Sequence, residues 1–191
     1  MTPINSLLSI ASILAGLFQP TPEANPLPVP LPPVERSVCE IRDCRLSDAG
    51  ETLIKQFEGY SPFIYLDSAG LPTIGHGHLI LKGEKIQEPL MLDAAAELLR
   101  KDTQRIQSGV RRITVGPLKQ QRYDALVSFT FNLGVGSYQE STLRKRVNAK
   151  QHDLVPAEFR KWIYVTKNGK KIKINGLILR REAEARLYSG D

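Results

Sequence analysis

From about residue 46 to the end of the chain, apolar residues recur mainly at the spacing of an α-helix. Asp48, with Glu51 three positions later, is typical of a helix start, and apolar residues then recur on one face of the segment. This first helix is expected to end at Gly59, which places Glu58 in its last turn.

Further helical patterns follow along the chain. Asp93 is expected to cap a helix that closes at Gly109, and Pro117 stands at the expected first position of the next helix. The remaining helical patterns begin after Ser141, lie at about 156–162, or cover LILRREAEARLY from residue 177 and end at Gly190.

Two segments show strand and turn signals instead. Residues 60–80 are short aromatic and β-branched runs broken by Ser-Pro, Ala-Gly and Leu-Pro, a pattern that predicts a small sheet with tight turns. In VTKNGKKIKI, the pair Asn168-Gly169 stands between alternating residues, which is a strong hairpin signal. A small sheet followed by a mostly helical C-terminal lobe is an α+β arrangement.

The N-terminal part of the chain is expected to lie outside the folded domain. Residues 1–22 contain no charged side chain and include a weakly apolar run at Ser6–Phe18. The run is short for a membrane span, since about 20 apolar residues are needed to cross a bilayer. We expect export or transient insertion in the inner membrane, the alternative being a disordered or packing arm. A proline-rich linker at 23–45 and a domain at 46–191 complete the predicted organisation.

The 191-residue chain has a net charge of +6, and the excess lies in the predicted domain, where 23 basic residues face 16 acidic ones. The basic runs at 144–146 and 167–171 suit either a solvated face or an anionic partner. Nucleic-acid binding would need a recognition element, and the scattered Lys and Arg residues do not form one. No nucleic-acid partner is therefore expected.

The two cysteines, Cys39 and Cys44, both precede the predicted domain. Their spacing lacks the second pair or the nearby histidines of a zinc site, so no metal is expected there. They are either two reduced thiols or, where the protein leaves the cytosol, a small-loop disulfide. The sequence does not decide between these two states.

Glu58 and Asp67 are isolated carboxylates in a segment otherwise built to turn and pack. Glu58 is expected to meet the negative end of a helix dipole among aromatic side chains, which favours the protonated form that a general acid needs. Asp67 precedes Ser-Ala-Gly in an expected turn, where backbone donors and water favour the ionised form. Glycoside cleavage uses such a pair, and the Thr73 hydroxyl can hold a water. The spacing alone is a weak signal, because two solvated carboxylates nine positions apart are common.

The same residues resemble the phage-type lysozymes of glycoside hydrolase family 24, in three blocks that stand in order over residues 48–189. The family pattern of Glu, eight residues, Asp, five residues and Thr stands here as Glu58, Asp67 and Thr73. RYDALVSFTFNLGVGSYQESTLRKRVN is similar to the family's central helix and following loop, and NGLILRREAEARLY to its C-terminal segment. The resemblance implies a lysozyme-like α+β fold.

The resemblance also implies a muramidase in which Glu58 is the general acid, Asp67 is the second carboxylate and Thr73 helps to place the attacking water. The bond cut would be the β-1,4 link from N-acetylmuramic acid to N-acetylglucosamine in peptidoglycan, with inversion as in the family's best-known members. No metal or organic cofactor is implied. The positions that match the lining of the family's saccharide cleft are Leu79, Phe131 and Thr142.

Several other side chains within these blocks have more than one interpretation. His78 could act as a base, but we expect it to pair structurally with an acidic side chain, and we expect His76 at the surface. Trp162 is expected in the core rather than stacked on sugar. Arg180 and Arg181 could meet anionic wall polymer or form ion pairs with nearby glutamates of the same segment, Glu182 or Glu184.

The implied role is that of a monomeric phage endolysin that acts on peptidoglycan in the host periplasm during lysis. Some family members are exported by an uncleaved signal-anchor, and residues 1–22 resemble one, so a membrane-tethered intermediate is expected. The run has no cysteine and the second catalytic position is Asp67, so thiol-switched activation is not expected. Without export, the protein would wait in the host cytoplasm for a holin. The alternative functions are a virion-associated wall-piercing lysozyme, a lytic transglycosylase and a non-catalytic wall-binding module.

Overall fold

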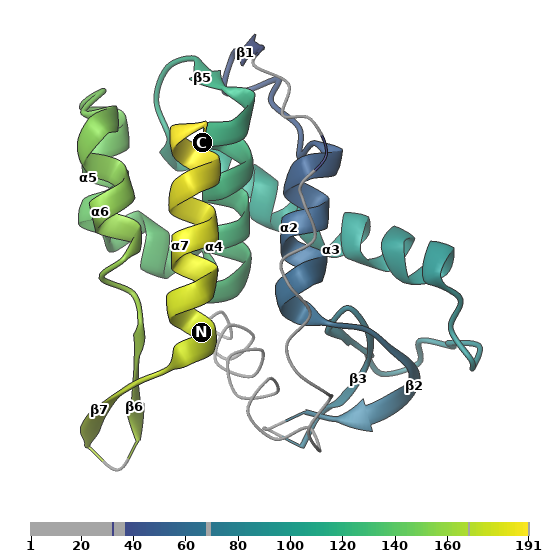
Figure 1. The fold of residues 1–191 in the computed structure, drawn as a ribbon. Coiled ribbons are helices and arrows are strands. Elements are labelled where there is room, and N and C mark those ends of the chain that lie inside the picture. Colours follow the sequence, from purple (N-terminus) through teal and green to yellow (C-terminus); the bar gives the residue numbers. More distant parts are fainter. Residues whose placement is uncertain (1–31, 33–36, 68–69, 168, 191) are drawn as a thin grey trace, which may run out of the picture.

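The structure, a computed structural model, describes residue 32 and residues 37–67, 70–167 and 169–190 (Figure 1). The predicted membrane segment at 1–22 lies outside the described residues, as do residues 23–31 and 33–36 of the predicted linker. Within the described ranges, no helix has the length and apolar character that a bilayer crossing requires. The elements in chain order are β1 (Val38–Cys39), α2 (Asp48–Glu58), β2 (Ser61–Leu66), β3 (Pro72–Gly75), β4 (His78–Leu79), α3 (Leu92–Ile113), β5 (Leu118–Lys119), α4 (Gln120–Glu140), α5 (Thr142–Asn148), the 3-10 turn η2 (His152–Leu154), α6 (Val155–Phe159), β6 (Tyr164–Lys167), β7 (Lys170–Lys173) and α7 (Asn175–Ser189).

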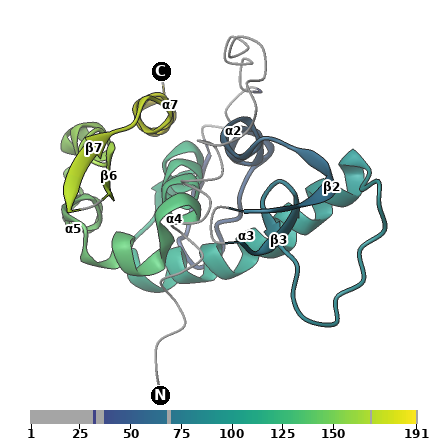
Figure 2. The ribbon, with the colours of Figure 1, turned by 90° about the horizontal axis from the view of Figure 1, so that it is seen from below.

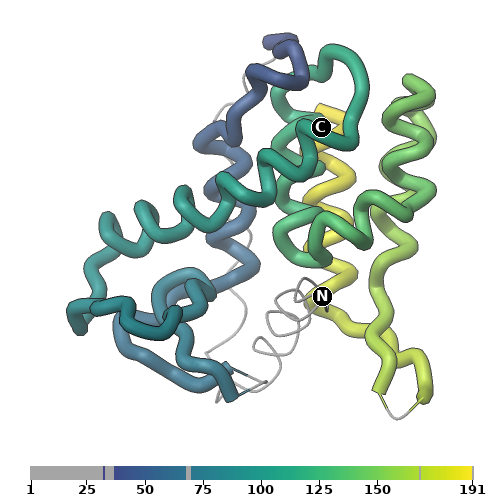
Figure 3. Tube along the Cα trace, turned by 180° about the vertical axis from the view of Figure 1, so that it is seen from behind, coloured from purple at the N-terminus to yellow at the C-terminus, as the bar shows by residue number. Residues whose placement is uncertain are grey.

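The elements form a helical body, built from α2 and α4 to α7, and a β lobe, built from the sheet β2–β3–β4 and the loop that leads to α3. Figure 3 shows α3 running from the β lobe across the back of the helical body. Seen from below (Figure 2), α4 lies between the β lobe on one side and α7 with the β6–β7 hairpin on the other. This arrangement is α+β, as the sequence predicted.

The main hydrophobic core surrounds α4, whose side chains are buried along most of its length. Phe129 is the centre of an aromatic group in which Tyr138, Phe159 and Trp162 meet its ring edge to face, with ring centroids 5.3 to 6.4 Å apart. Such geometry adds to the stabilisation that burial provides. The prediction that Trp162 belongs to the core is confirmed.

Helix α2 ends where the sequence predicted but begins differently. Its N-cap is Ser47, whose hydroxyl accepts a hydrogen bond from the Gly50 amide, whereas Asp48 is the first helical residue. Ser47 is itself held by the buried carboxylate of Asp124 on α4, which accepts from the Ser47 amide at 3.0 Å and from its hydroxyl at 2.5 Å. At the other end, Gly59 has a φ of 70° and terminates the helix directly after Glu58.

The predicted bounds of α3 were wrong at both ends. The helix begins after Met91, without a side-chain cap, and continues through Gly109 to Ile113. Gly109 is needed for packing, because a Cβ atom at this position would lie 2.5 Å from a methyl carbon of Val135 on α4. A glycine that permits close helix contact therefore looked like a helix terminator in the sequence.

The expected role of Pro117 as the first residue of the central helix was also wrong. Pro117 precedes the short strand β5, and α4 starts three residues later at Gln120. The shorter helices after Ser141 and near residue 156 are present as α5 and α6, and Ser141 caps α5 through its side chain.

The β lobe contains the small sheet predicted for residues 60–80, with the strand order β2–β3–β4 and antiparallel pairing. Thr73 on the central strand stands opposite Tyr65 on one side and Leu79 on the other. Beneath the sheet, Ile74 packs with Leu90 and Ala95 in a second, smaller core. This core attaches the β lobe to the first turns of α3.

The predicted hairpin near the C-terminus is formed by β6 and β7, and it leads directly into α7. Gly169 in its turn has a φ of 73°, which favours glycine. Helix α7 ends at Gly190 in the left-handed conformation, as predicted.

The segment before α2 is attached to the helical body. Strand β1 pairs with β5, and a disulfide joins Cys39 to Cys44, with Cα atoms 5.4 Å apart. Arg111 of α3 donates a hydrogen bond at 3.1 Å to the Cys44 carbonyl. The Ser37 carbonyl also accepts a hydrogen bond from the Gln120 amide, so the chain contacts the helical body well before α2 begins.

Candidate active site

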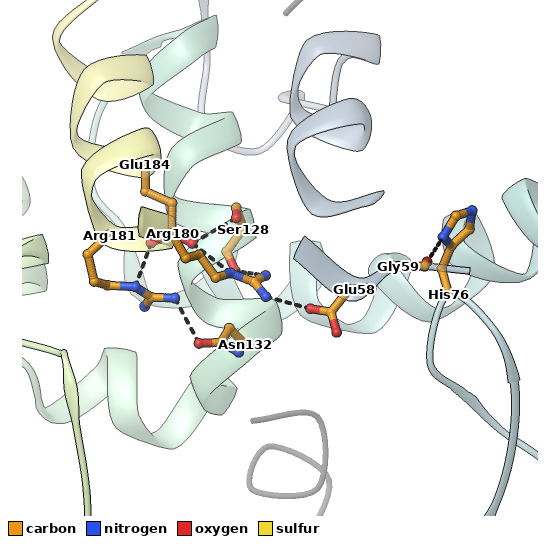
Figure 4. Close-up of polar contacts among 8 residues, drawn as sticks. All are labelled: Glu58, Gly59, His76, Ser128, Asn132, Arg180, Arg181 and Glu184. Carbon is orange, nitrogen blue, oxygen red and sulfur yellow. Dashed lines mark hydrogen bonds and ion pairs between the residues drawn. The ribbon is translucent and has the colours of Figure 1, made fainter. Parts of the chain in front are cut away.

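Glu58 is the last residue of α2, and its side chain is only 5% exposed. Arg180 of α7 reaches it from the other side and donates a hydrogen bond from Nη1 to Oε1 at 2.6 Å (Figure 4). The two residues are 122 positions apart in the chain, so this contact depends on the packing of α7 against α2. The short distance and the charge of the guanidinium make it a strong hydrogen bond.

Arg180 belongs to a buried network that joins α2, α4 and α7. Its Nε atom donates to Oε1 of Glu184 at 3.2 Å, and its Nη2 atom donates to the Ser128 carbonyl at 3.3 Å. The Ser128 hydroxyl also donates to Glu184, at 2.8 Å. Arg180 is thus held on three sides, and its guanidinium lies in a fixed position beside Glu58.

The electrostatics of this network keep Arg180 charged. Burial lowers the pKa of Arg180, but the carboxylates of Glu58 and Glu184 together raise it, and the net shift of the pKa is upward. The side chains of Arg180 and Glu184 are 4% and 0% exposed, so solvent screens these interactions little. Glu58 therefore has a permanently cationic partner.

Arg181 extends the network on the far side of Glu184. Its Nη2 atom donates to Asn132 Oδ1 at 2.7 Å, and its Nε atom lies 3.2 Å from the second carboxylate oxygen of Glu184. Burial lowers the pKa of Arg181 to about 10, although Glu184 acts in the opposite direction. The sequence left the partners of both arginines open, and the structure shows buried pairs with Glu184, while Glu182 pairs with Arg160 and Arg186 at the surface.

The second oxygen of Glu58, Oε2, lies on the side of the β lobe. A Cβ atom placed on Gly77, in the β3–β4 turn, would lie 3.8 Å from it. Gly77 has a φ of 84°, which favours glycine, and the absent side chain leaves room next to this oxygen. One oxygen of Glu58 is therefore bound to the helical body and the other faces the β lobe.

Asp67 lies in the tight turn between β2 and β3. Its Oδ1 atom accepts a hydrogen bond from the Leu71 amide at 2.9 Å, and its own carbonyl accepts from the Gly70 amide. The turn and the backbone donor that the sequence predicted for Asp67 are both present. They fix the carboxylate at the edge of the β lobe, where it is half-buried.

Tyr65 lies close enough to both carboxyl groups for their charges to affect its pKa. Its pKa is raised first by burial and then by the negative charges of Glu58 and Asp67, so its hydroxyl lies within the field of both. The sequence analysis did not single out Tyr65. The available signal was its position two residues before Asp67, since residues two apart in a strand share a face.

Thr73 is buried, with 4% of its surface exposed, and its hydroxyl donates to the Leu71 carbonyl at 3.1 Å. Because it stands opposite Tyr65 and Leu79 in the sheet, these three side chains form one row. The structure therefore groups Leu79 with Thr73. Phe131 is half-buried on α4 beside the main core, and Thr142 is the exposed first residue of α5. The substrate-binding roles of all three stay predictions.

The two histidines of the β3–β4 region are both buried. His78 pairs with Asp102 through Nδ1 at 2.8 Å and with Glu84 through Nε2 at 3.2 Å, which confirms the predicted acidic partner. The hydrogen bond with Asp102 is the main reason that the pKa of His78 is raised. The expectation that His76 lies at the surface was wrong: it is 8% exposed, and its Nδ1 contacts the Gly59 carbonyl (Figure 4). The turn folds under the end of α2, and burial lowers the pKa of His76.

Within the described residues, no group of three or more His, Cys, Asp or Glu side chains is arranged to hold a metal ion. The site consists instead of a carboxyl group at a helix end, a guanidinium behind it, and a sheet edge that carries a second carboxylate and a buried hydroxyl. Glycoside hydrolases use a pair of carboxyl groups in distinct environments to cleave their substrate. Together with the α+β fold, this site defines a protein of the lysozyme class.

Comparison with known proteins gives the family. The chain belongs to the phage lysozyme family, whose profile matches residues 55–184. It is similar to the endolysin of Acyrthosiphon pisum secondary endosymbiont phage 1, with 35% identity over 143 residues that cover 75% of this chain and 97% of the relative. It is also similar to the SAR-endolysin of Escherichia phage Mu, with 31% identity over 65% of this chain and 70% of the relative.

A solved structure shows the same relation in three dimensions. The endolysin from Escherichia coli O157:H7 phage FAHEc1 superposes with a TM-score of 0.71 and 37% identity, covering 76% of this chain and 94% of that one. The match confirms the lysozyme-like fold. The chain is accordingly a lysozyme of the endolysin kind, which is a glycoside hydrolase.

Proposed function

We propose that Glu58, Asp67 and Thr73 carry out the hydrolysis of the β-1,4 bond between N-acetylmuramic acid and N-acetylglucosamine in peptidoglycan. Phage lysozymes act on peptidoglycan, and endolysins act on the host cell wall. The observation that carries the assignment is the position of Glu58, whose Oε1 is held by Arg180 while Oε2 faces the β lobe.

The two oxygens of Glu58 have different tasks in this mechanism. The proton given to the glycosidic oxygen would be carried on Oε2, because Oε1 accepts the hydrogen bond from Arg180. When the proton leaves, Glu58 becomes a carboxylate, and the adjacent guanidinium stabilises that charge. Arg180 acts through Glu58 and is therefore a positioning residue.

Asp67 and Thr73 act on the water. Asp67 faces the positive charge that develops on the sugar ring and, as a base, takes the proton of the water that attacks the anomeric carbon. The Thr73 hydroxyl donates its hydrogen to the Leu71 carbonyl, so its lone pairs can accept a hydrogen bond from that water. The expected outcome is inversion at the anomeric carbon.

We propose further that residues 1–22 associate with the inner membrane, so that a monomeric lysozyme reaches the host periplasm through a membrane-tethered intermediate. The similarity to an SAR-endolysin and the uncharged apolar run at Ser6–Phe18 support this. Fractionation of cells that produce the full chain tests it. Recovery in the membrane pellet is expected, and a wholly soluble protein would contradict the tether.

The test of the catalytic assignment compares the full chain with Glu58→Gln and with Glu182→Gln, a matched change at a surface ion pair. Isolated sacculi are the substrate. We expect Glu58→Gln to fold and to lose about 10²- to 10⁴-fold in rate, as for removal of a general acid, and Glu182→Gln to stay near the parent. Mass analysis should show reducing muramic-acid ends. Anhydro-muramic ends would instead make the enzyme a lytic transglycosylase and remove the role given to Asp67.

A further inference from the structure

The β6–β7 hairpin is a surface element whose charged side chains are all basic. Between Tyr164 and Lys173 it carries four lysines and no acidic residue, and each of these lysines is exposed: Lys167, Lys170, Lys171 and Lys173. Neighbouring cations are neutralised, since Lys161 pairs with Glu158 at 2.8 Å and Arg160 with Glu182 at 2.7 Å. The described part of the chain provides no ion pair for any of the four hairpin lysines.

The register of the hairpin places like charges against each other. Lys167 stands directly opposite Lys170 at the turn. Side chains in such positions have Cβ atoms about 4.5–5.5 Å apart, and like charges there destabilise the pair. Folding of the hairpin alone would favour an acidic residue at one of these positions. An anionic partner would relieve this repulsion.

The cations stand on both faces of the hairpin. Lys167 and Lys170 share one face with Ile172, which is 41% exposed. Lys171 and Lys173 share the other face with Tyr164, which is 52% exposed. A flat anionic surface, such as a bilayer, would be met by one face only, whereas a branched polymer can surround both.

The hairpin stands at the catalytic end of the molecule. It leads into α7 at Asn175, and Arg180 follows five residues later, about 7.5 Å along the helix axis at 1.5 Å per residue. Figure 1 and Figure 3 show the hairpin and the β lobe at the same end of the protein, on opposite sides of the C-terminal end of α2. A long polymer that is held at Glu58 and runs away from the β lobe would pass the hairpin.

We propose that the β6–β7 hairpin binds the carboxylates of the peptide stems that branch from the glycan strand next to the bond being cut. This inference rests on the proposed function, because it names a second part of the same substrate. Stem peptides are attached to N-acetylmuramic acid, carry free carboxylates and recur along the strand. They supply anions on several sides of the hairpin, and the exposed Tyr164 offers them an apolar contact.

The experiment replaces Lys167, Lys170, Lys171 and Lys173 by Gln together in the full chain. The matched control replaces four other exposed lysines: Lys82, Lys85, Lys145 and Lys150. Both variants lose the same charge. Each is assayed on sacculi and on the same glycan strands after an amidase has removed the peptides, at low and at physiological salt.

The hairpin variant should raise KM on sacculi about tenfold at low salt, as expected for the loss of several partly exposed charge contacts. It should change KM on peptide-free strands less than twofold, and the control variant should change neither. An equal loss in both variants, or an equal loss on both substrates, would overturn the inference. Binding of each variant to phosphatidylglycerol vesicles is measured as well. A hairpin variant that loses only its vesicle binding would also overturn the inference, because the partner would then be a lipid surface.

A binding measurement separates this inference from the proposed catalysis. Glu58→Gln, with and without the four hairpin substitutions, is sedimented with sacculi, and the bound fraction is measured. Hairpin-dependent sedimentation is expected whether or not the parent cleaves the wall. If the parent cleaves sacculi but both forms sediment equally, the hairpin inference fails and the proposed function stands.

Discussion

Two buried ionic clusters stabilise the two parts of the molecule, and they differ in their cation. In the helical body, Arg180 pairs with Glu58 and Glu184, and between the β lobe and α3, His78 pairs with Asp102 of α3 and with Glu84. A guanidinium stays charged at any pH at which the fold survives, whereas an imidazole is charged only below its pKa. The carboxyl group proposed as the acid thus has a permanent partner, while the cluster in the β lobe depends on pH.

The clusters also differ in their access to solvent. The side chains of Arg180, Glu58 and Glu184 are at most 5% exposed. In the cluster around His78, the side chains of Asp102 and Glu84 are 31% and 20% exposed, so water can solvate them if the histidine is lost. Removing the cation should therefore cost far more in the helical body than in the β lobe.

The largest expected effect follows Arg180→Met, which leaves Glu58 buried without its cation and leaves Glu184 with Arg181 alone. We expect a loss of about 3–5 kcal/mol in the free energy of unfolding, as for breaking a buried pair, measured by urea denaturation. The control is Arg160→Met, since Arg160 pairs with Glu182 at the surface with 49% of its side chain exposed, and it should cost less than about 1 kcal/mol. Equal losses in the two variants would show that burial of an ion pair does not set the cost of removing its cation.

An intermediate effect is expected for His78→Asn, and it should depend on pH. The pKa of His78 is raised, mainly by its hydrogen bond with Asp102, so the charged form stabilises the fold. This stability is fully present below the unfolded-state pKa of about 6.5 and is lost as pH rises through the higher folded-state pKa. At pH 5.5 the variant should be less stable by about 1.5–3 kcal/mol.

Urea titrations between pH 5 and 9 check this prediction. The difference between parent and variant should shrink as pH rises, and Asp102→Asn should weaken the pH dependence in the parent background. A difference that grows with pH would mean that His78 is held in its neutral form.

The smallest effect is expected for Tyr65→Phe, which removes only the hydroxyl that lies in the field of Glu58 and Asp67. We expect kcat/KM on sacculi to fall about three- to tenfold, as for one modest hydrogen bond lost in the transition state. The free energy of unfolding should change by less than about 1 kcal/mol. If the free energy of unfolding falls and kcat/KM does not, the Tyr65 hydroxyl stabilises the β lobe and takes no part in catalysis.

Local signals in the sequence predicted the parts of the fold that local physics determines. The end of α2 at Gly59, the turn around Asp67 and the hairpin at Asn168-Gly169 each depend on a few adjacent residues, and the described parts of all three were found as predicted. The predicted N-cap, Asp48, was wrong by one residue. The neighbouring Ser47 has a hydroxyl that can cap the helix equally well, and it does so in the structure.

Contacts between distant residues could not be read from the sequence. Gly109 lies inside α3 because Val135 of another helix packs against it, and His76 is buried because its turn lies under α2. The sequence offered two possible partners for Arg180, Glu182 and Glu184, but not Glu58, since nothing local relates α7 to the end of α2. The candidate carboxylates were thus predictable, but the group that holds one of them was not.

The most direct test of the account measures kcat and KM of folded Arg180→Lys on sacculi. Lysine keeps the charge but cannot contact Glu58, Glu184 and the Ser128 carbonyl at once, as the guanidinium does. If Arg180 positions Glu58, kcat should fall about 10- to 100-fold while KM stays near the parent value, as expected for a misplaced acid. An unchanged kcat would contradict the claim that the proton donor depends on this pair.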